Sequence, residues 1–366
     1  MQKESLPKTM KAVMCYGPED YRLEEVETPQ AGGGEVVVKI HASGICASDF
    51  KCYSGAPMFW GDENRTAYVD APVIPGHEFV GEVVQLGEGA AEKYALQIGD
   101  MAISEQIVPC WECRYCRTGK YWMCQAHNIY GFQKNVHGSM AEYMKFPARA
   151  IVHKVPKSIS VEKAAMIEPL ACSIHAVQRG EIEFGDVVVV AGAGTLGLGM
   201  VGAARLKNPG VLISVDMQDY RLEIAKRLGA DITINPEKED AIQKVLDLTE
   251  GYGCDVYIEA TGQPGAVVQG LQMIRKLGVF VEFSVMRELV TADWTIIGDT
   301  KELDVHGSHL GPYTYPLAID YINRNLIDVE PIVTHVMPMD NFETGFQKVH
   351  EAKDSIKVLL TPYIVK

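Results

Sequence analysis

The 366-residue chain lacks any apolar run that approaches the roughly 18–20 residues needed to cross a bilayer. Its first residues, MQKESLPKTMKAV, also lack the apolar stretch of a signal peptide. The sequence contains no internal repeat and no low-complexity tract. We therefore expect a cytoplasmic protein, and the length predicts two domains, with three as the alternative.

Basic residues are in short supply. The chain has 34 Lys and Arg against 48 Asp and Glu, a formal net charge of −14. A nucleic-acid-binding protein needs basic surface to neutralise phosphate, and an anionic membrane surface repels an acidic protein. The charge therefore argues against both kinds of partner, while 47% hydrophobic residues suffice for a globular core.

Cysteine is sparse but concentrated. There are nine cysteines, an odd number in a chain too large to need disulfide staples, so reduced thiols are expected. Four of them, Cys110, Cys113, Cys116 and Cys124, fall in CWECRYCRTGKYWMC with the spacing C-x2-C-x2-C-x7-C. Four such sulfurs can hold one tetrahedral zinc. An iron–sulfur cluster and unrelated thiols are the alternatives, although no proline follows the last cysteine as in ferredoxin runs.

The first 165 or so residues predict a β-rich domain, because short β-like runs alternate with Gly- and Pro-rich segments such as AGGGE and VIPGHE. The predicted strands are Glu35–Ile40, Val80–Gln85, Met101–Ile103 and Ala150–Val155. Helical spacing then begins at Ser160, a plausible N-cap.

Strands and helices alternate beyond that point, which predicts an α/β domain with a doubly wound parallel sheet and crossover helices. The predicted strands are Asp186–Ala191, Val211–Asp216, Asp255–Ala260 and Gly278–Ser284, and the predicted helices are Leu196–Lys207 and Tyr220–Leu228. After residue 310 the pattern is mixed, with a helix near Pro316–Arg324 and a last strand over Ile356–Thr361.

A glycine motif lies between the first of these strands and the first helix. VVVVAGAGTLGLGM places G-x-G-x-x-G at Gly192, Gly194 and Gly197. Such glycines allow a tight turn, a close approach of the backbone to a pyrophosphate, and close packing of helix and strand. The sequence therefore predicts a dinucleotide site, which would include Thr195 and Leu196 within the motif.

The next strand ends in an acid, Asp216, nineteen residues after Gly197. A carboxylate there accepts hydrogen bonds from the ribose hydroxyls and repels a 2′-phosphate, which favours NAD over NADP. The alternative for Asp216 is a helix-capping acid. Arg221 in the following helix either flanks the adenine or is a solvated surface residue.

A second set of candidate metal ligands is scattered: Cys46, His77, Glu78 and Glu168. Each alone is unremarkable, since a lone Cys is usually a small core residue. The Gly76–His77–Glu78 turn before a predicted strand is the stronger indication, because it presents two ligand types together.

Together these motifs carry a resemblance. GHEFVGE, the G-x-C-x-S-D segment, the four-cysteine segment and AGAGxxG stand in one order over essentially the whole chain. The chain resembles the zinc-containing medium-chain dehydrogenases, closest to the polyol branch, with sorbitol, L-threonine and bacterial erythritol and threitol dehydrogenases as neighbours.

The resemblance implies a role for each residue. Cys46 and His77 match ligands of a catalytic zinc, with either Glu78 or Glu168 as the direct third ligand. The four clustered cysteines match a structural zinc site, giving one catalytic and one structural zinc per subunit. Ser48 matches a proton-relay hydroxyl, with a turn-capping serine as the alternative, and Asp49 would buttress the ligand histidine or its loop.

The resemblance also implies a GroES-like zinc domain over 1–165, completed by 307–366, and a Rossmann NAD-binding domain over 166–306. The implied reaction is NAD-dependent oxidation of a secondary hydroxyl of a small polyol to a ketose, with erythritol or threitol to a tetrulose as the specific candidate. Oxidation of an amino alcohol such as L-threonine is the alternative, and a non-catalytic dinucleotide-binding protein is a third interpretation.

Two further expectations concern assembly and specificity. The family implies a homodimer or homotetramer joined partly through an edge strand of the cofactor domain, for which Gly278–Ser284 is the candidate. The long segment 52–76 between the two ligand motifs either overhangs the site and selects substrate length, or forms a subunit contact or solvated loop.

Overall fold

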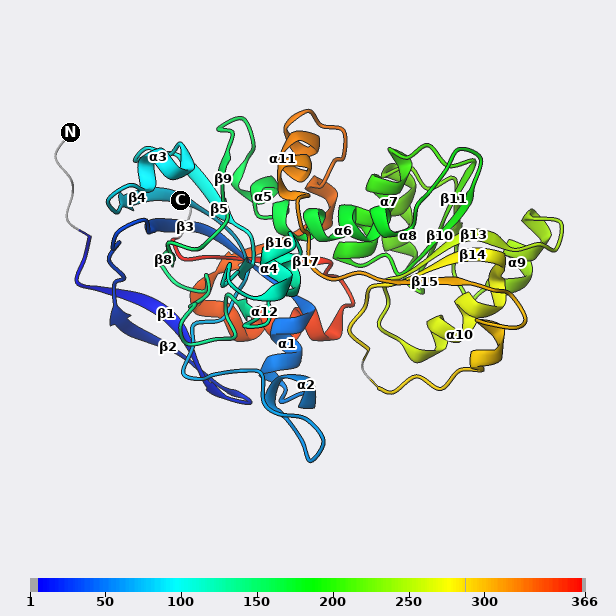
Figure 1. The fold of residues 1–366 in the computed structure, drawn as a ribbon, viewed down its shortest axis with the longest axis horizontal. Helices are drawn as coiled ribbons and strands as arrows, with labels where there is room; N and C mark the ends of the chain where they lie inside the picture. Colours follow the sequence, from blue (N-terminus) through cyan, green and yellow to red (C-terminus); the bar gives the residue numbers. More distant parts are fainter. Residues whose placement is uncertain (1–5, 287, 364–366) are drawn as a thin grey trace. The chain divides into compact units, whose positions relative to one another are not determined.

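The structure, a computed structural model, describes residues 6–286 and 288–363. Its contacts divide the chain into two compact units, Met1–Glu168 with Val333–Lys366, and Pro169–Ile332 (Figure 1). The sequence-based division lay at 165 and 307, and its outermost residues, 1–5 and 364–366, lie outside the described part. In that part no helix combines the length and the apolar character that a bilayer crossing demands.

A seven-stranded sheet is the centre of the first unit. Its order is β16-β17-β3-β4-β5-β9, with β8 pairing with β3 off this path. Residues of β3 and β17 are almost all buried, as expected for apolar central strands. The strands are β3 (Val36–Ile45), β4 (Glu78–Leu86), β5 (Met101–Ser104), β8 (Tyr143–Phe146), β9 (Val152–Val155), β16 (Val333–Pro338) and β17 (Lys357–Thr361).

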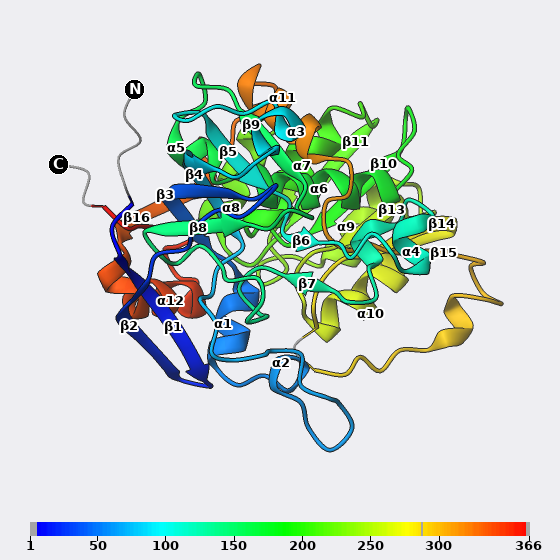
Figure 2. The same cartoon turned by 60° about the vertical axis from the view of Figure 1, so that its left-hand side comes forward.

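Two small sheets and several short helices complete this unit, and Figure 2 shows the β1–β2 hairpin and the α1–α2 segment. The small sheets are β1 (Thr9–Gly17) with β2 (Asp20–Glu27), and β6 (Ile107–Val108) with β7 (Asn128–Ile129). The helices are α1 (Ala47–Tyr53), α2 (Pro57–Trp60), α3 (Ala90–Tyr94), α4 (Arg114–Arg117), α5 (Val161–Ala164) and α12 (Phe342–Glu351), with 3-10 turns at η1 (Tyr121–Met123) and η4 (Met339–Asn341).

The second unit is built on a parallel sheet in the order β12-β11-β10-β13-β14-β15. Numbered along the chain, this is the 3-2-1-4-5-6 order of a Rossmann fold, whose ligand crevice lies at the switch point beside the first strand. The strands are β10 (Val187–Ala191), β11 (Val211–Val215), β12 (Ile232–Ile234), β13 (Cys254–Glu259), β14 (Ile274–Glu282) and β15 (Asp304–Gly307).

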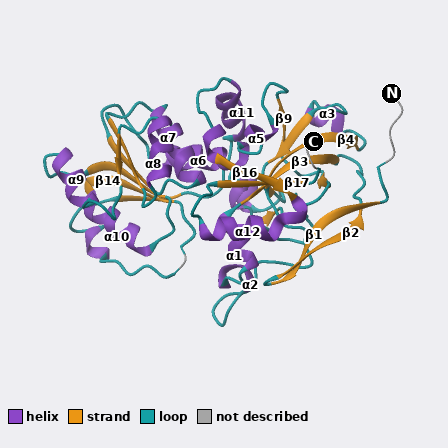
Figure 3. Cartoon of the chain, turned by 180° about the vertical axis from the view of Figure 1, so that it is seen from behind, coloured by secondary structure: helices purple, strands orange, loops and turns teal. Residues whose placement is uncertain are grey.

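Helices pack against this sheet, as the purple and orange elements of Figure 3 show, and they bury an apolar core that includes Val189, Ile213 and Tyr257. Of the helices of this unit, α7 (Thr195–Arg205), α8 (Asp219–Arg227) and α10 (Pro264–Met273) contact its strands. The others are α6 (Ile167–Arg179), which begins at the boundary of the units, α9 (Ala241–Leu248) and α11 (Tyr315–Asn323), with 3-10 turns at η2 (Trp294–Ile296) and η3 (Glu330–Ile332). The α/β fold predicted from the strand–helix alternation is confirmed.

The expectation that Gly278–Ser284 forms the edge of this sheet is wrong. That segment overlaps β14, which pairs with β13 on one side and with β15 on the other. The edges of the described sheet are β12 and β15. A four-residue strand with mostly exposed, partly polar residues such as β15 gives little periodic signal, so the sequence did not indicate it.

Candidate functional site: two cysteine-containing centres and a glycine turn

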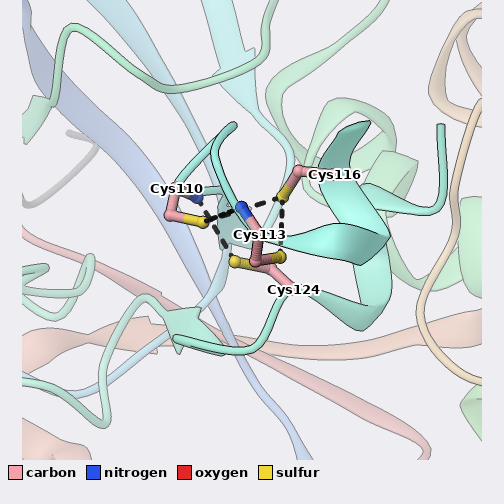
Figure 4. Close-up of side chains that lie close together, drawn as sticks. All are labelled: Cys110, Cys113, Cys116 and Cys124. Carbon is pink, nitrogen blue, oxygen red and sulfur yellow. Dashed lines mark hydrogen bonds between the residues drawn. The ribbon is translucent and has the colours of Figure 1, made fainter. Parts of the chain in front are cut away.

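The four clustered cysteines converge on one point (Figure 4). Cys116 Sγ lies 3.6 Å from Cys113 Sγ and 3.9 Å from Cys110 Sγ. A tetrahedral zinc with Zn–S bonds of about 2.3 Å requires sulfurs roughly 3.8 Å apart. The geometry fits one ion, and it leaves no room between the thiols for a cluster of several irons.

Backbone amides of residues 110–125, the four-cysteine lobe, point at the sulfurs. The N–H groups of Glu112 and Cys113 donate to Cys110 Sγ at 3.4 and 3.3 Å, and that of Gln125 donates to Cys113 Sγ at 3.5 Å. The amide of Gln125 is the largest of the contributions that lower the pKa of Cys113 to about 6. Such donors stabilise thiolates, which are the form that binds metal.

The second centre forms where two neighbouring strands of the first unit meet. Gly44 near the end of β3 is in register with Glu78 at the start of β4. Cys46 follows β3 directly and His77 precedes β4 directly. One donor atom each of Cys46, His77 and Glu78 lies within 4.8 Å of the others. Two strand ends thus bring together a thiol, an imidazole and a carboxylate, a donor set that suits zinc.

Asp49 contacts two of these residues, Cys46 through its backbone amide and His77 through its ring. Its side chain is buried in the first turn of α1, where Oδ2 accepts a hydrogen bond from the Cys46 amide at 2.9 Å. Its Oδ1 lies 3.4 Å from His77 Nδ1, which leaves Nε2 of that ring as the ligand atom. Burial lowers the pKa of His77, but the Asp49 and Cys46 charges raise it overall. Asp49 therefore has the geometry of a residue that orients metal ligands.

Lys357 is a buried residue beside this centre that sequence reasoning missed. It begins β17, is only 2% exposed, and its Nζ donates to the Ile45 carbonyl at 3.0 Å and to Glu78 Oε2. Burial lowers the pKa of Lys357, but the charges of Glu78, Cys46 and Glu168 raise it overall. A lysine inside the otherwise apolar run IKVLL was the available signal.

The structure places the remaining predicted residues of this centre close by. Glu168 is 3% exposed in the first turn of α6, and it does not belong to the trio of Cys46, His77 and Glu78. Ser48 lies in the first turn of α1, half-buried, two residues after Cys46.

The segment 52–76 has a packed part and an exposed part. Phe59 of α2 is buried and stacks on Phe132 at 5.2 Å between ring centroids, and the Phe132 ring lies 5.5 Å from that of His77. The Tyr68 hydroxyl donates to the His127 carbonyl at 2.8 Å. Residues 62–67 are exposed. The inner part thus reaches the neighbourhood of a candidate metal ligand.

The glycine motif of the second unit forms the turn between β10 and α7. Gly192 has φ of +100°, and a Cβ there would lie 2.7 Å from the Ala260 carbonyl oxygen. A Cβ on Gly197 would overlap the carbonyl oxygen of Gly192, whereas the space beside Gly194 is open. With Thr195 and Leu196 starting α7, an open turn at a helix N-terminus is suited to a pyrophosphate.

Asp216 lies directly after β11 and contacts this turn. Its Oδ2 accepts from the Ala193 amide at 2.7 Å and its Oδ1 from the Gln218 amide at 2.8 Å. Each carboxylate oxygen has a further lone pair for a ligand hydroxyl. In α8, Arg221 Nε donates to the Tyr220 hydroxyl at 3.0 Å.

The same edge of the sheet carries two acids that the sequence did not single out. Glu259 and Glu282 are in register at the ends of β13 and β14. Burial, with the charge of Glu259, raises the pKa of Glu282 to about 7. Glu259 Oε1 accepts from the amides of Thr261 and Gly262 at 2.7 and 3.0 Å, so it fixes the turn that follows β13.

Comparison with known families matches both units. The family described as "Alcohol dehydrogenase GroES-like domain" matches residues 32–157, and "Zinc-binding dehydrogenase" matches residues 195–324. The first match contains Cys46, His77 and the four-cysteine lobe. The second begins at Thr195, inside the glycine motif.

Individual proteins are similar over almost the whole chain. The erythritol/L-threitol dehydrogenase of Mycolicibacterium smegmatis is 52% identical over 98% of this chain and 99% of its own length. The L-threonine 3-dehydrogenase of Pyrococcus horikoshii is 34% identical over 96% of this chain and 97% of its own. The crystal structure of Bacillus subtilis 2R,3R-butanediol dehydrogenase superposes with a TM-score of 0.85 at 29% identity, covering 97% and 100% of the two chains.

Proposed function

The chain belongs to the zinc-containing medium-chain dehydrogenase family, in its polyol branch, and we propose that it oxidises a secondary hydroxyl of a small polyol to a ketone with NAD as the hydride acceptor. The observation that carries the proposal is the meeting of Cys46, His77 and Glu78 at the ends of β3 and β4, in a chain whose relative at 52% identity is an erythritol/L-threitol dehydrogenase.

The catalytic residues follow from this centre. Cys46 and His77, with Glu78 or Glu168, would hold zinc, which supplies a Lewis acid that polarises the substrate hydroxyl. Asp49 keeps the His77 ring in one orientation and fixes the Cys46 backbone. Ser48 takes the hydroxyl proton of the substrate as the C–H bond gives up its hydride.

The cofactor residues are proposed from the glycine turn. NAD supplies the hydride acceptor. The turn at Gly192, Gly194, Thr195, Leu196 and Gly197 binds its pyrophosphate at the N-terminus of α7. Asp216 accepts hydrogen bonds from the adenosine ribose and repels the 2′-phosphate of NADP. Arg221 flanks the adenine.

The four-cysteine lobe is proposed as a second, structural zinc site, so that each subunit holds two zinc ions. The sulfur spacing of 3.6 and 3.9 Å and the amide donors to sulfur support this. All four ligand positions would be taken by Cys110, Cys113, Cys116 and Cys124, which leaves no place for a substrate.

A four-carbon polyol, erythritol or threitol, is the proposed substrate and a tetrulose the product. The relative from Mycolicibacterium smegmatis supports this choice. Segment 52–76 would set the accepted chain length, because its Phe59 packs on the Phe132 ring beside His77. The L-threonine 3-dehydrogenase of Pyrococcus horikoshii, at 34% identity, favours the alternative of amino-alcohol oxidation.

The test is NAD reduction by zinc-loaded protein with erythritol, D- and L-threitol, xylitol, sorbitol, 2,3-butanediol and L-threonine. Turnover on a four-carbon polyol is expected. Turnover on L-threonine alone would replace the polyol by the amino alcohol. No turnover on the whole panel, with NAD binding intact, would contradict the proposed function. Running NADP beside NAD tests the cofactor preference assigned to Asp216.

We further propose that the enzyme acts in the cytoplasm as a homodimer or homotetramer. The exposed edge strand β15, which lacks a second neighbour in the described sheet, supports assembly through strand pairing. Light scattering on the eluted protein gives the subunit count. A monomer would contradict the assembly without affecting the proposed reaction.

A further inference from the structure

Two acids lie side by side on one face of the parallel sheet of the second unit. Glu259 ends β13, Glu282 ends β14, and the two residues are in register. Residues in register on parallel strands have their side chains on the same face, and the strands lie about 4.8 Å apart. Tyr257, two residues before Glu259, packs on α10, where its hydroxyl donates to the Ala266 carbonyl at 2.8 Å. Both carboxyl groups therefore lie on the face that α10 covers.

The two acids have no cation beside them in the part of the chain that the structure describes. Glu259 is fully buried, and neither acid forms an ion pair with a described residue. Glu259 Oε2 and Glu282 Oε1 are both buried and accept no hydrogen bond from the described chain. Two neighbouring carboxylates in such a place do not readily ionise together, so one of them retains a proton.

Glu282 is the acid that retains the proton. Glu259 Oε1 accepts hydrogen bonds from the amides of Thr261 and Gly262 at 2.7 and 3.0 Å, which stabilise its ionised form. The described chain offers the Glu282 carboxyl group no comparable donor. Burial, together with the charge of Glu259, raises the pKa of Glu282 to about 7.

The other elements around Glu282 add no charge on its face of the sheet. Helix α10 contains no titratable residue. Strand β15 places Gly307 in register with Glu282, so His306, one residue earlier, lies on the opposite face. His309 comes two residues after that strand, and the charge that contributes to the raised pKa of Glu282 is that of Glu259.

The pair lies at the edge of the sheet along which the nicotinamide half of a dinucleotide would extend. The glycine turn after β10 is the proposed pyrophosphate site, and Asp216 after β11 directs the adenosine half to that side. The other half then extends over the carboxyl ends of β13 and β14. The turn that Glu259 holds packs on the glycine turn, since a Cβ on Gly192 would lie 2.7 Å from the Ala260 carbonyl oxygen.

The two forms of the cofactor differ in charge at this end. The nicotinamide ring is a cation in NAD and is neutral in NADH. An ionised Glu282 attracts the cationic ring, whereas a protonated Glu282 does not. Binding of NAD therefore lowers the pKa of Glu282, and by linkage ionisation of Glu282 strengthens NAD binding by the same factor.

We propose that Glu282 is a specificity-determining residue that favours the oxidised over the reduced cofactor, because its carboxyl group releases a proton to solvent when NAD binds and takes one up once the ring is neutral. This inference rests on the proposed use of NAD. It extends that proposal by assigning the choice between NAD and NADH to an acid outside the glycine motif.

Calorimetric titrations of the zinc-loaded protein with NAD, NADH and ADP-ribose test the inference. Repeating each titration in buffers of different ionisation enthalpy gives the number of protons released. If NAD lowers the pKa of Glu282 by about one unit, Glu282 releases about half a proton near pH 6.5, and NAD binds about fivefold more tightly at about pH 8 than at about pH 6. NADH and ADP-ribose, which lack the cationic ring, should show neither effect from Glu282.

Glu282→Gln keeps the shape of the side chain but has no proton to release. It should lose this proton release and the associated pH dependence of NAD binding, with ADP-ribose affinity unchanged. Any proton released at the zinc centre is common to both proteins and cancels in the difference. Asp304→Asn is the matched control, because it removes an exposed acid from the opposite end of the neighbouring strand β15 and should behave as the parent protein. Equal proton release and equal preference for NAD over NADH in the parent and in Glu282→Gln would overturn the inference.

Glu282→Met keeps the test decisive if the amide variant does not fold. Its apolar side chain of similar length suits a covered position and removes the repulsion with Glu259. It should show the same loss of proton release with NAD, and retention of that release would overturn the inference. A folded parent protein that binds neither NAD nor NADH would contradict the proposed function and the inference together, whereas NAD binding without the difference between parent and variants contradicts the inference alone.

Discussion

The four-cysteine lobe and the Cys46 centre both gather candidate metal donors, but they draw them from different parts of the chain. All four donors of the lobe are cysteine thiols, and they lie within fifteen consecutive residues. The Cys46 centre takes a thiol, an imidazole and a carboxylate from the ends of two strands, β3 and β4, and a buried lysine pairs with that carboxylate. The lobe is therefore local and uniform, whereas the Cys46 centre is chemically mixed and forms only when β3 and β4 pair.

The two centres also differ in what supports them. Main-chain amides of the lobe itself point at its sulfurs. The Cys46 centre is supported by side chains: Asp49 for its histidine and Lys357 for its glutamate. Substitutions in the lobe should therefore lower the free energy of unfolding, and substitutions in the Cys46 centre should lower kcat.

Cys46→Ser gives the largest expected effect. If Cys46 is a ligand of the proposed catalytic zinc, its loss removes several kcal/mol of Lewis-acid stabilisation, which corresponds to a fall in kcat on the order of 10³-fold or more. NAD affinity should stay unchanged, because the glycine turn belongs to the other unit. Steady-state turnover and a fluorescence titration with NAD measure the two quantities. Near-normal turnover would exclude Cys46 as a ligand.

Cys113→Ser is the matched change in the lobe. A closed structural zinc contributes folding free energy, so we expect a loss of roughly 3–5 kcal/mol and a fall in Tm of about 10 °C. The kcat per folded molecule should stay within about threefold, since no substrate position exists there. Thermal unfolding followed by circular dichroism, with zinc content measured in parallel, checks both. A variant with normal Tm and lost turnover would reverse the roles of the two centres.

The sequence predicted the parts of the fold that depend on local pattern. Strand β10, the glycine turn and helix α7 lie within one or two residues of the ranges predicted from periodicity and glycine spacing. The four-cysteine lobe was likewise visible, because its spacing is local. The family resemblance and the α/β class are confirmed by the matches to both units.

Features that depend on register were not predictable. Lys357 and Ile45 are 312 residues apart, and only the pairing of β17 with β3 brings them together. The edge of the parallel sheet was misassigned for the same reason, since nothing local distinguishes β14 from β15 as its last strand.

Gly44→Ala tests whether the Cys46 centre depends on tertiary packing. The added methyl overlaps Glu78 Oε2, so the carboxylate has to leave its place beside Lys357. We expect a loss of about 1–3 kcal/mol in stability and a fall in kcat of about 10–100-fold. Gly33→Ala is the matched control, because a methyl there meets nothing within 4 Å. Equal behaviour of the two variants would mean that the position of Glu78 does not affect catalysis.

Arg149→Ala should have the smallest effect. It tests whether zinc binding by the lobe depends on contacts with the rest of its unit. The Arg149 guanidinium donates to the Cys110 carbonyl at 3.1 Å and pairs with Glu112 at 2.9 Å, with both charged side chains more than half exposed. Exposed pairs contribute at most about 1 kcal/mol, so the Tm should change by no more than a few degrees and zinc content should not change. If this variant instead loses zinc as Cys113→Ser does, the lobe is held by the surrounding fold rather than by its own thiolates and amides, and the contrast with the Cys46 centre fails.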